Sequence, residues 1–275
     1  MNSNEKQTSV NNLPSIWLVG ASSGIGAALM KELDARDTML FVSARNLSEI
    51  QKTFARYAAR IIPVEMDMVD PASVHQAQTQ ILKHTDHLDR VIINAGTCEY
   101  IDSYEIDLDA VKRVMDTNFF GALQVINASL PLLRKAKAMS DKSGQPAPQL
   151  ALVASSVTYQ ALPRAGAYGA SKAAIRYMME CLKLDLQHEG LDIRVVSPGF
   201  VKTPLTDKND FPMPFRISAE EAAQRIAKGL DGRRFDVHFP KRFTLILKAI
   251  SLLPDFIRFP LVGKSSRHEA GTSQI

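Results

Sequence analysis

The chain has 275 residues, of which 45% are hydrophobic and 23% charged, which is ordinary for a soluble globular protein. Two cysteines, Cys98 and Cys181, exclude a disulfide framework of more than one bridge and favour a reducing cytosol. The net charge of +4 lies mainly in the C-terminal part, where 228–275 holds nine Lys/Arg and four Asp/Glu, so no diffuse nucleic-acid surface is indicated.

Short apolar runs alternate with helical patterns along most of the chain. Strands are expected at 15–20, 38–45, 61–67, 89–96, 150–155 and 192–199. Helices are expected at 27–36, 71–84 and 108–139, and a further helix carries Tyr168 and ends near residue 190. The runs are apolar on both faces, as a sheet covered by helices requires. We therefore predict an α/β fold, a doubly wound, Rossmann-like parallel sheet with helices on both faces and a short helical C-terminal appendage.

The chain is expected to form one domain with three parts. Residues 1–13 are polar, lack the apolar core of a signal peptide, and are predicted to be a disordered lead-in. Residues 14–205 are the predicted dinucleotide-binding and catalytic core. Residues 206–275 are the predicted substrate lid and amphipathic C-terminal segment of the same domain.

The loop "GASSGIG" joins the first predicted strand to the first helix. Glycines at 20, 24 and 26 allow a sharp turn and a close approach to a pyrophosphate at the helix N-terminus. The second strand ends in Ala44 and Arg45, where an acidic residue would favour NAD. Arg45 can instead pair with a 2′-phosphate, which predicts NADP(H) over NAD(H); the alternative is a solvated surface arginine.

Tyr168 and Lys172 stand four residues apart on one predicted helix face, among small residues. A lysine beside a phenol favours the phenolate, so we expect a lowered pKa for Tyr168 and a usable proton donor. Taken alone, the pair favours an ordinary exposed contact, so the rest of the chain must decide.

Six motifs in order make the chain resemble the short-chain dehydrogenase/reductase family: "GASSGIG", "INAG" at 93–96, Asn118, the serines at 155 and 156, "YGASK" at 168–172 and "SPGFVKT" at 197–203. The resemblance implies that Tyr168 transfers the proton, that Lys172 lowers its pKa and holds the nicotinamide ribose, and that Asn118 holds a water of the relay. Either Ser155 or Ser156 is the implied catalytic serine, and residue counting favours Ser155. The cofactor contacts predicted from the loop, from Arg45 and from the resemblance are Gly20, Ser22, Ser23, Gly24, Ile25, Gly26, Arg45, Asp67, Met68, Asn94, Ala95, Gly96, Tyr168, Lys172, Pro198, Gly199, Val201 and Thr203.

The resulting hypothesis is an NADPH-dependent reductase of a hydrophobic ketone or aldehyde, or the reverse alcohol dehydrogenase, in a cytoplasmic homo-oligomer without a metal. Two alternatives stay open: an NADP-binding sensor or scaffold without turnover, and a sugar-nucleotide epimerase or dehydratase. The sequence does not name the substrate.

Residues 241–264 carry a narrow polar stripe at helical spacing, made of Thr244, Lys248, Ser251, Asp255 and Arg258. Nearly everything else between 243 and 259 is apolar, and Pro254 and Pro260 are expected to break the segment into short helices. Three roles remain open: a substrate lid, a dimer seam, or contact with a membrane interface through the flanking cations, among them Lys264 and Arg267.

Overall fold

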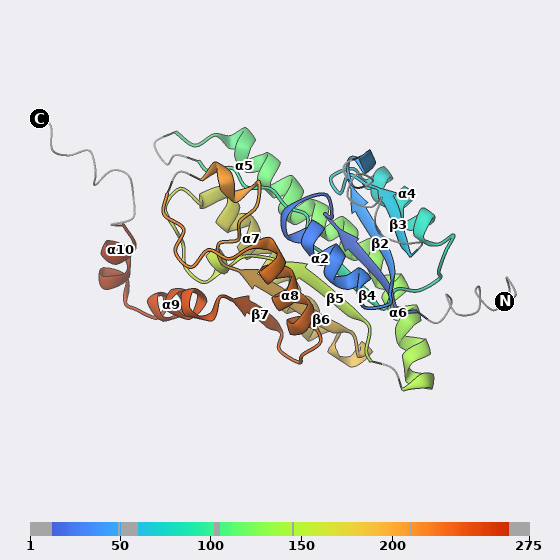
Figure 1. Ribbon diagram of the computed structural model, residues 1–275. Helices are drawn as coiled ribbons and strands as arrows, with labels where there is room; N and C mark the ends of the chain where they lie inside the picture. The colour runs from blue at the N-terminus through green and yellow to red at the C-terminus, as the bar shows by residue number, and fades with distance from the viewer. Residues whose placement is uncertain are drawn as a thin grey trace, which may run out of the picture.

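A computed structural model describes residues 13–48, 50, 60–101, 105–144, 146–209 and 211–263, and its centre is a seven-stranded parallel sheet (Figure 1). The strand order is β3-β2-β1-β4-β5-β6-β7. From β1 to β3 each new strand is added on one side of the sheet, and from β4 to β7 on the other side, so the strand order switches between β1 and β4. The strands are β1 (Ser15–Val19), β2 (Met39–Ala44), β3 (Ile61–Glu65), β4 (Arg90–Ile93), β5 (Gln149–Val153), β6 (Asp192–Pro198) and β7 (Asp236–Phe239). The predicted fold class is confirmed.

Helices cover both faces of the sheet (Figure 1). One face packs against α2 (Gly24–Asp34) and α8 (Ala219–Leu230). The other face packs against α4 (Pro71–Ile81), α6 (Ala122–Ser143) and α7 (Gly166–Asp185). Further α-helices are α5 (Leu108–Met115), α9 (Lys241–Ser251) and α10 (Asp255–Gly263).

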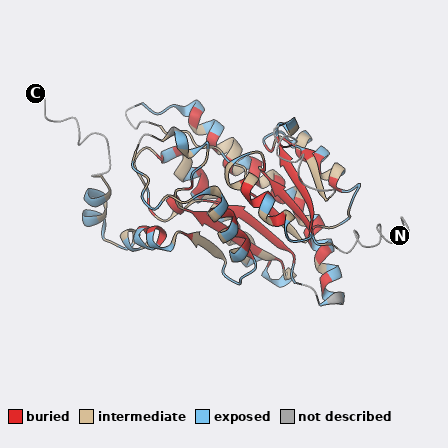
Figure 2. Cartoon of the chain, in the orientation of Figure 1, coloured by how far each residue is buried: buried red, intermediate tan, exposed pale blue. Residues whose placement is uncertain are grey.

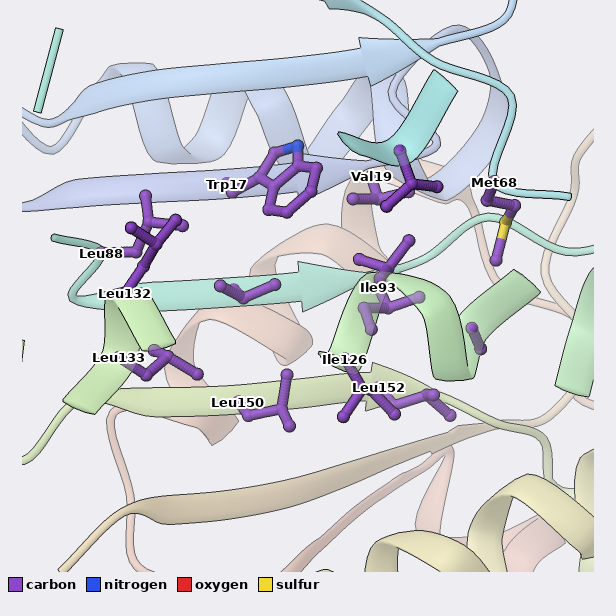
Figure 3. Close-up of a cluster of buried hydrophobic side chains, with 14 of the residues drawn as sticks. Trp17, Val19, Met68, Leu88, Ile93, Ile126, Leu132, Leu133, Leu150 and Leu152 are labelled. Atoms are coloured by element: carbon purple, nitrogen blue, oxygen red, sulfur yellow. The ribbon is translucent and has the colours of Figure 1, made fainter. Parts of the chain in front are cut away.

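Alternation along the strands divides the core into two layers, and β1, β2 and β5 are buried throughout (Figure 2). In β1, Ile16 and Leu18 pack toward α2 and α8, while Trp17 and Val19 pack toward the opposite helices. Figure 3 shows the second layer, in which Trp17 lies over leucines and isoleucines of β4, β5 and α6. The indole of Trp17 donates a hydrogen bond to Ser43 Oγ at 2.9 Å, which satisfies its one polar group inside the core.

Two features differ from the expectations. First, β7 is a seventh strand and α8 belongs to the layer that covers the sheet, although both fall in 206–275. The sheet and the helices that cover it therefore extend past residue 205. Second, the long helix expected over 108–139 is interrupted by a π-helical turn, Asp116–Gly121, between α5 and α6. The predicted lead-in, except residue 13, lies outside the described residues, as do Lys264 and Arg267.

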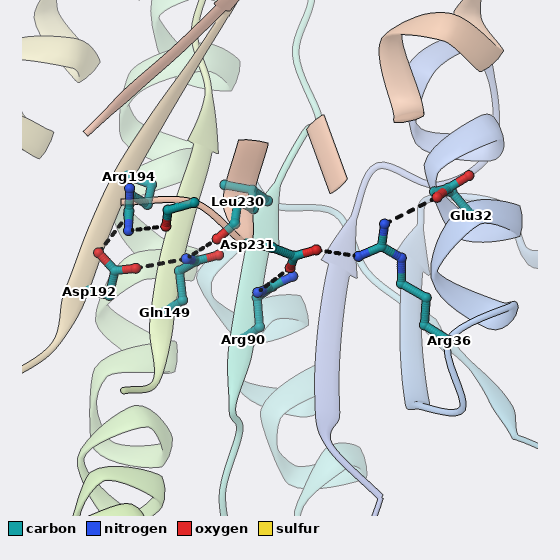
Figure 4. A network of polar contacts seen from close by, with 9 residues as sticks. Glu32, Arg36, Arg90, Gln149, Asp192, Arg194, Leu230 and Asp231 are labelled. Carbon is teal, nitrogen blue, oxygen red and sulfur yellow. Dashed lines mark hydrogen bonds and ion pairs between the residues drawn. The ribbon is translucent and has the colours of Figure 1, made fainter. Parts of the chain in front are cut away.

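The amino ends of the strands carry a polar network (Figure 4). Arg194 of β6 is 5% exposed, and its guanidinium donates to Asp192 Oδ1 at 2.6 Å and to the Gly232 carbonyl at 2.7 Å. Gln149 at the start of β5 donates to Asp192 Oδ2 at 2.8 Å and to the Leu230 carbonyl at 2.9 Å. This network connects the loop after α8 to the amino ends of β5 and β6.

Candidate active site

The opposite edge, at the carboxyl ends of the strands, holds a cavity of about 690 Å³. It reaches from Arg45 after β2 to Tyr168 on α7, and it crosses the β1/β4 boundary where the strand order reverses. Open parallel sheets bind their ligands at such a switch point. The fold thus provides an elongated site at the place where the sequence expects a dinucleotide.

The glycine loop forms the floor beside β1. Gly20 has φ +86°, and a side chain there would bring its first carbon within 2.5 Å of the Ala95 backbone. At Gly26, a first side-chain carbon would come within 1.9 Å of the Gly20 carbonyl oxygen. Asn94 Nδ2 donates to that same carbonyl at 2.8 Å and so fixes the loop against β4. These glycines are required because the loop packs against backbone.

The loop opens α2 toward the cavity. Ser23 precedes the helix with an extended backbone and makes no side-chain cap hydrogen bond. The free N–H groups of a helix start, with the positive end of the helix dipole, suit a phosphate. Ser22, Ser23 and Gly24 line the cavity at this point, so the residues present fit a pyrophosphate.

The end of the cavity near β2 is lined by Arg45, Asp67 and Met68. Asp67 Oδ1 accepts a hydrogen bond from the Val69 N–H at 3.0 Å, and its own N–H donates to Ser73 Oγ at 3.0 Å. Arg45 is exposed and follows Ala44, the last residue of β2. This end of the cavity therefore offers a guanidinium directly after the second strand.

The other end is formed by Tyr168 and Ser155. The Ser155 hydroxyl makes a side-chain hydrogen bond with Tyr168. Burial raises the pKa of Tyr168 to about 12, and this hydrogen bond opposes the shift. The expectation of a lowered pKa is therefore wrong for the protein alone, because removing the phenol from water disfavours its ionised form.

Lys172 lies one helical turn further along α7 and is 5% exposed. Its Nζ donates to the Val153 carbonyl oxygen at 3.0 Å and stands 6.0 Å from the centre of the Tyr168 ring. Burial lowers the pKa of Lys172 to about 8. Gly96 leaves room beside the amine, since a first side-chain carbon there would approach Lys172 Nζ to 3.1 Å and Asn118 Oδ1 to 3.0 Å.

Asn118 sits in the π-helical turn and is buried. Its Oδ1 accepts from the Thr97 N–H at 2.8 Å, and its Nδ2 donates to the Thr97 carbonyl at 2.8 Å and to Ser171 Oγ at 2.9 Å. This one side chain therefore links the loop after β4 to α7, the helix of Tyr168 and Lys172.

The structure brings most of the predicted site residues to one cavity. Every predicted cofactor contact except Gly26 lines it, and so does Ser155. Ser156 is buried at the start of a short 3₁₀ helix, and Asn118 stands behind the loop after β4. The sequence analysis does not predict a part of the cavity wall that includes a surface ion pair; its residues are Thr97, Glu99, Arg113, Asp116 and Thr117.

A row of aromatic rings runs from the Tyr168 end toward α9. Burial raises the pKa of Tyr100, and the nearby Tyr168 adds to that shift. The ring centroids of Tyr100 and Phe211 are 5.4 Å apart, those of Phe211 and Phe200 6.0 Å, and those of Phe200 and Phe243 5.2 Å. Tyr100 thus begins a row of aromatic rings that reaches α9.

Comparison with known proteins agrees with this geometry. The family model described as short chain dehydrogenase matches residues 15–212. The chain belongs to the short chain dehydrogenase family. An uncharacterized oxidoreductase of Myxococcus xanthus is 30% identical over 86% of this chain and 92% of its own length. The 11-beta-hydroxysteroid dehydrogenase 1A of Arabidopsis thaliana is 29% identical over 89% of this chain and 73% of its own length.

The fold of this family is also found in solved structures. A short chain dehydrogenase from Burkholderia cenocepacia in complex with NADP superposes with a TM-score of 0.76 at 23% identity, covering 91% of this chain and 98% of that one. This likeness shows the fold. Membership of the family makes the protein an NAD(P)-dependent oxidoreductase.

Proposed function

We propose that the protein is an NADPH-dependent reductase of a hydrophobic ketone or aldehyde, or catalyses the reverse alcohol oxidation. The observation that carries this proposal is the meeting of Ser155, Tyr168 and Lys172 at one end of a cavity whose other end carries Arg45. A nicotinamide cofactor fits between them, with its pyrophosphate on the glycine loop and the start of α2. When bound, NADPH supplies the hydride.

The proton comes from this chain. Tyr168 stays protonated at neutral pH because burial raises its pKa to about 12, so it can donate to a carbonyl oxygen. Ser155 is the proposed second donor to that oxygen, since it is hydrogen-bonded to Tyr168. Lys172 provides a positive charge next to the phenolate that forms, while its bond to Val153 fixes its position. Asn118 holds the helix and the loop together around these groups.

Arg45 supports the preference for NADPH. It lines the cavity at the end of β2, where a guanidinium can form a forked, charge-assisted pair with a 2′-phosphate. The dianionic phosphate gains from this contact, and the 2′-hydroxyl of NADH gains little.

A hydrophobic substrate is supported by the aromatic row next to Tyr168. Tyr100, Phe211 and Phe200 offer apolar surface to a substrate whose carbonyl reaches Tyr168. A relative of similar sequence carries the name of a hydroxysteroid dehydrogenase, a class that acts on a large apolar alcohol. The cytoplasmic location and homo-oligomeric state stay predictions, and light scattering after size-exclusion chromatography measures the second.

The test is oxidation of NADPH by the purified protein with a panel of aliphatic, aromatic and steroid-like carbonyls, and reduction of NADP with the matching alcohols. We expect turnover that favours the larger apolar compounds and NADPH over NADH. Tight cofactor binding without turnover on any compound in either direction would instead favour a sensor or scaffold.

A further inference from the structure

The helices α9 and α10 lie at the end of the sheet beyond β7 (Figure 1). The polar stripe of α9 faces the domain. Thr244 is fully buried, and its Oγ1 lies 2.7 Å from His238 Nδ1 on β7. Lys248 places its Nζ 3.5 Å from Asp236 Oδ2 and 4.4 Å from the centre of the Tyr159 ring. These contacts fix which side of α9 turns inward.

The anchor for α9 is itself part of the folded core. Tyr159 donates from its hydroxyl to Asp236 Oδ2 at 2.5 Å, and Arg176 of α7 donates to the same oxygen at 3.1 Å. Phe243 and Leu247 are buried beside this cluster. The orientation of α9 is therefore set by buried polar contacts and buried apolar contacts together.

The consequence is an apolar surface that faces outward. Leu245 and Ile246 of α9 are exposed, and Leu252 at its end is 85% exposed. Helix α10 has no buried residue, and Figure 2 draws most of it as exposed. We call this surface the C-terminal apolar face; its exposed residues are Leu245, Ile246, Leu252, Phe256, Ile257, Phe259 and Leu261.

Cations outnumber carboxylates around this face. Residues 241–263 contain four cationic side chains and one carboxylate, Asp255. Asp255 is paired with Arg258 at 2.6 Å. Lys241 and Arg242 are both exposed at the start of α9. The net charge of this segment is 4 − 1 = +3.

We propose that the C-terminal apolar face docks on an anionic membrane surface, with α9 and α10 lying in the interface. Apolar side chains enter the acyl boundary, while cations at the rim meet anionic headgroups. None of the helices described here is long and apolar enough to cross a bilayer, so the contact is with one leaflet. The proposal concerns a surface outside the cavity and does not depend on the reaction assigned to it.

Charge complementarity favours the membrane over a second copy of the chain. In a two-fold dimer the face would meet itself, and the exposed Lys241 and Arg242 of both copies would lie at one contact. An anionic bilayer instead supplies opposite charge and an apolar interior.

The test is flotation of the full chain with vesicles. We expect binding to phosphatidylcholine vesicles that contain about 30 mol% phosphatidylglycerol, weaker binding to phosphatidylcholine alone, and weaker binding again at high salt. The double variant Leu252→Ser/Phe256→Ser removes two of the most exposed side chains and should lower partitioning about tenfold or more. The variant Lys241→Glu/Arg242→Glu should remove the preference for phosphatidylglycerol.

The matched control is Leu108→Ser/Leu184→Ser, which changes two apolar residues that are 74% and 66% exposed elsewhere on the surface. It should bind vesicles as the wild type does. The proposal is overturned if the wild type ignores anionic vesicles at low salt, or if both double serine variants behave alike. It is also overturned if Leu252→Ser/Phe256→Ser dissociates an oligomer in sedimentation while vesicle binding is unchanged, because the face would then be a seam between copies.

Discussion

Polar groups have opposite roles at the two ends of the strands, which we call the amino edge and the carboxyl edge of the sheet. At the amino ends of the strands, Arg194 and Asp192 are bonded to each other and to neighbouring backbone or amide groups (Figure 4). At the carboxyl ends, Tyr168, Lys172 and Arg45 line a cavity of about 690 Å³. Burial shifts the pKa of Tyr168 up and that of Lys172 down.

The sheet is stabilised at the amino ends of its strands and is less stable at the carboxyl ends, where the active-site groups lie. A buried group that is fully bonded strengthens the fold, and a buried titratable group that faces a cavity costs stability but can act on a ligand. We therefore expect substitutions at the amino edge to change the free energy of unfolding and substitutions at the carboxyl edge to change turnover.

Two adjacent serines at the carboxyl ends of the strands, Ser155 and Ser156, are expected to differ strongly in their effect on kcat. Ser155→Ala removes the hydroxyl that bonds Tyr168, and loss of one such donor typically lowers kcat about 10²–10³-fold. Ser156→Ala is the matched control, because that residue is buried outside the cavity and should retain activity within a few-fold. Steady-state kinetics on both variants decides the assignment, and the reverse order of activities would move the role to Ser156.

The amino edge is tested by Asp192→Ala. This change leaves the Arg194 guanidinium, which is buried, without its carboxylate, and breaking such a pair costs up to about 3 kcal/mol. The control Arg225→Ala breaks an exposed i,i+4 pair with Glu221 and should cost about 0.3–0.5 kcal/mol. Urea unfolding gives both values, and equal costs would show that the network at the amino edge is no stronger than a surface pair.

The cofactor end of the cavity is tested by Arg45→Ala. Loss of a charge-assisted hydrogen bond of roughly 1.5–3 kcal/mol should raise the Kd for NADPH about ten- to a hundredfold and leave that for NADH unchanged. Arg113→Ala is the control, since Arg113 lines the same cavity but its guanidinium pairs with Glu99 at 2.7 Å. Equal wild-type affinities for the two cofactors, measured by fluorescence titration, would contradict the preference.

The smallest effect is a pH dependence. The pKa of Tyr168, raised to about 12 by burial, keeps the phenol protonated, whereas the pKa of Lys172, lowered to about 8 by burial, lets the amine lose its charge above that pH. The kcat/KM for reduction should therefore be level near neutral pH and decline above about pH 8 by up to about tenfold per unit. A decline toward acid, with the protein folded by circular dichroism, would contradict this account.

The sequence predicts the residues that line the cavity better than it predicts the ends of the fold. Gly20 and Asn94 directly follow β1 and β4, so a parallel sheet places both at the carboxyl ends of its strands. Strand β7 escapes detection because its four residues include Asp236 and His238 and only Phe239 is buried. The π-helical turn depends on Asn118 bonding to Thr97, which is distant in sequence.

The structure of the C-terminal segment is likewise only partly predictable from the sequence. Its helical spacing is visible in the sequence, and Pro254 does separate α9 from α10. Pro260, expected to break the segment, lies inside α10. Thr244 and Lys248 point inward because they contact His238 and Asp236. Both of these partners lie on β7, the strand that the sequence does not predict.

The most direct test of the division between the two edges is Tyr168→Phe, measured for turnover, NADPH affinity and unfolding together. We expect kcat to fall about 10²–10⁴-fold, because the proton donor is lost, while NADPH affinity stays within a few-fold. We also expect a free energy of unfolding equal to or above that of the wild type, since a partly buried hydroxyl that faces the cavity is removed. Activity within a few-fold of the wild type would contradict the account.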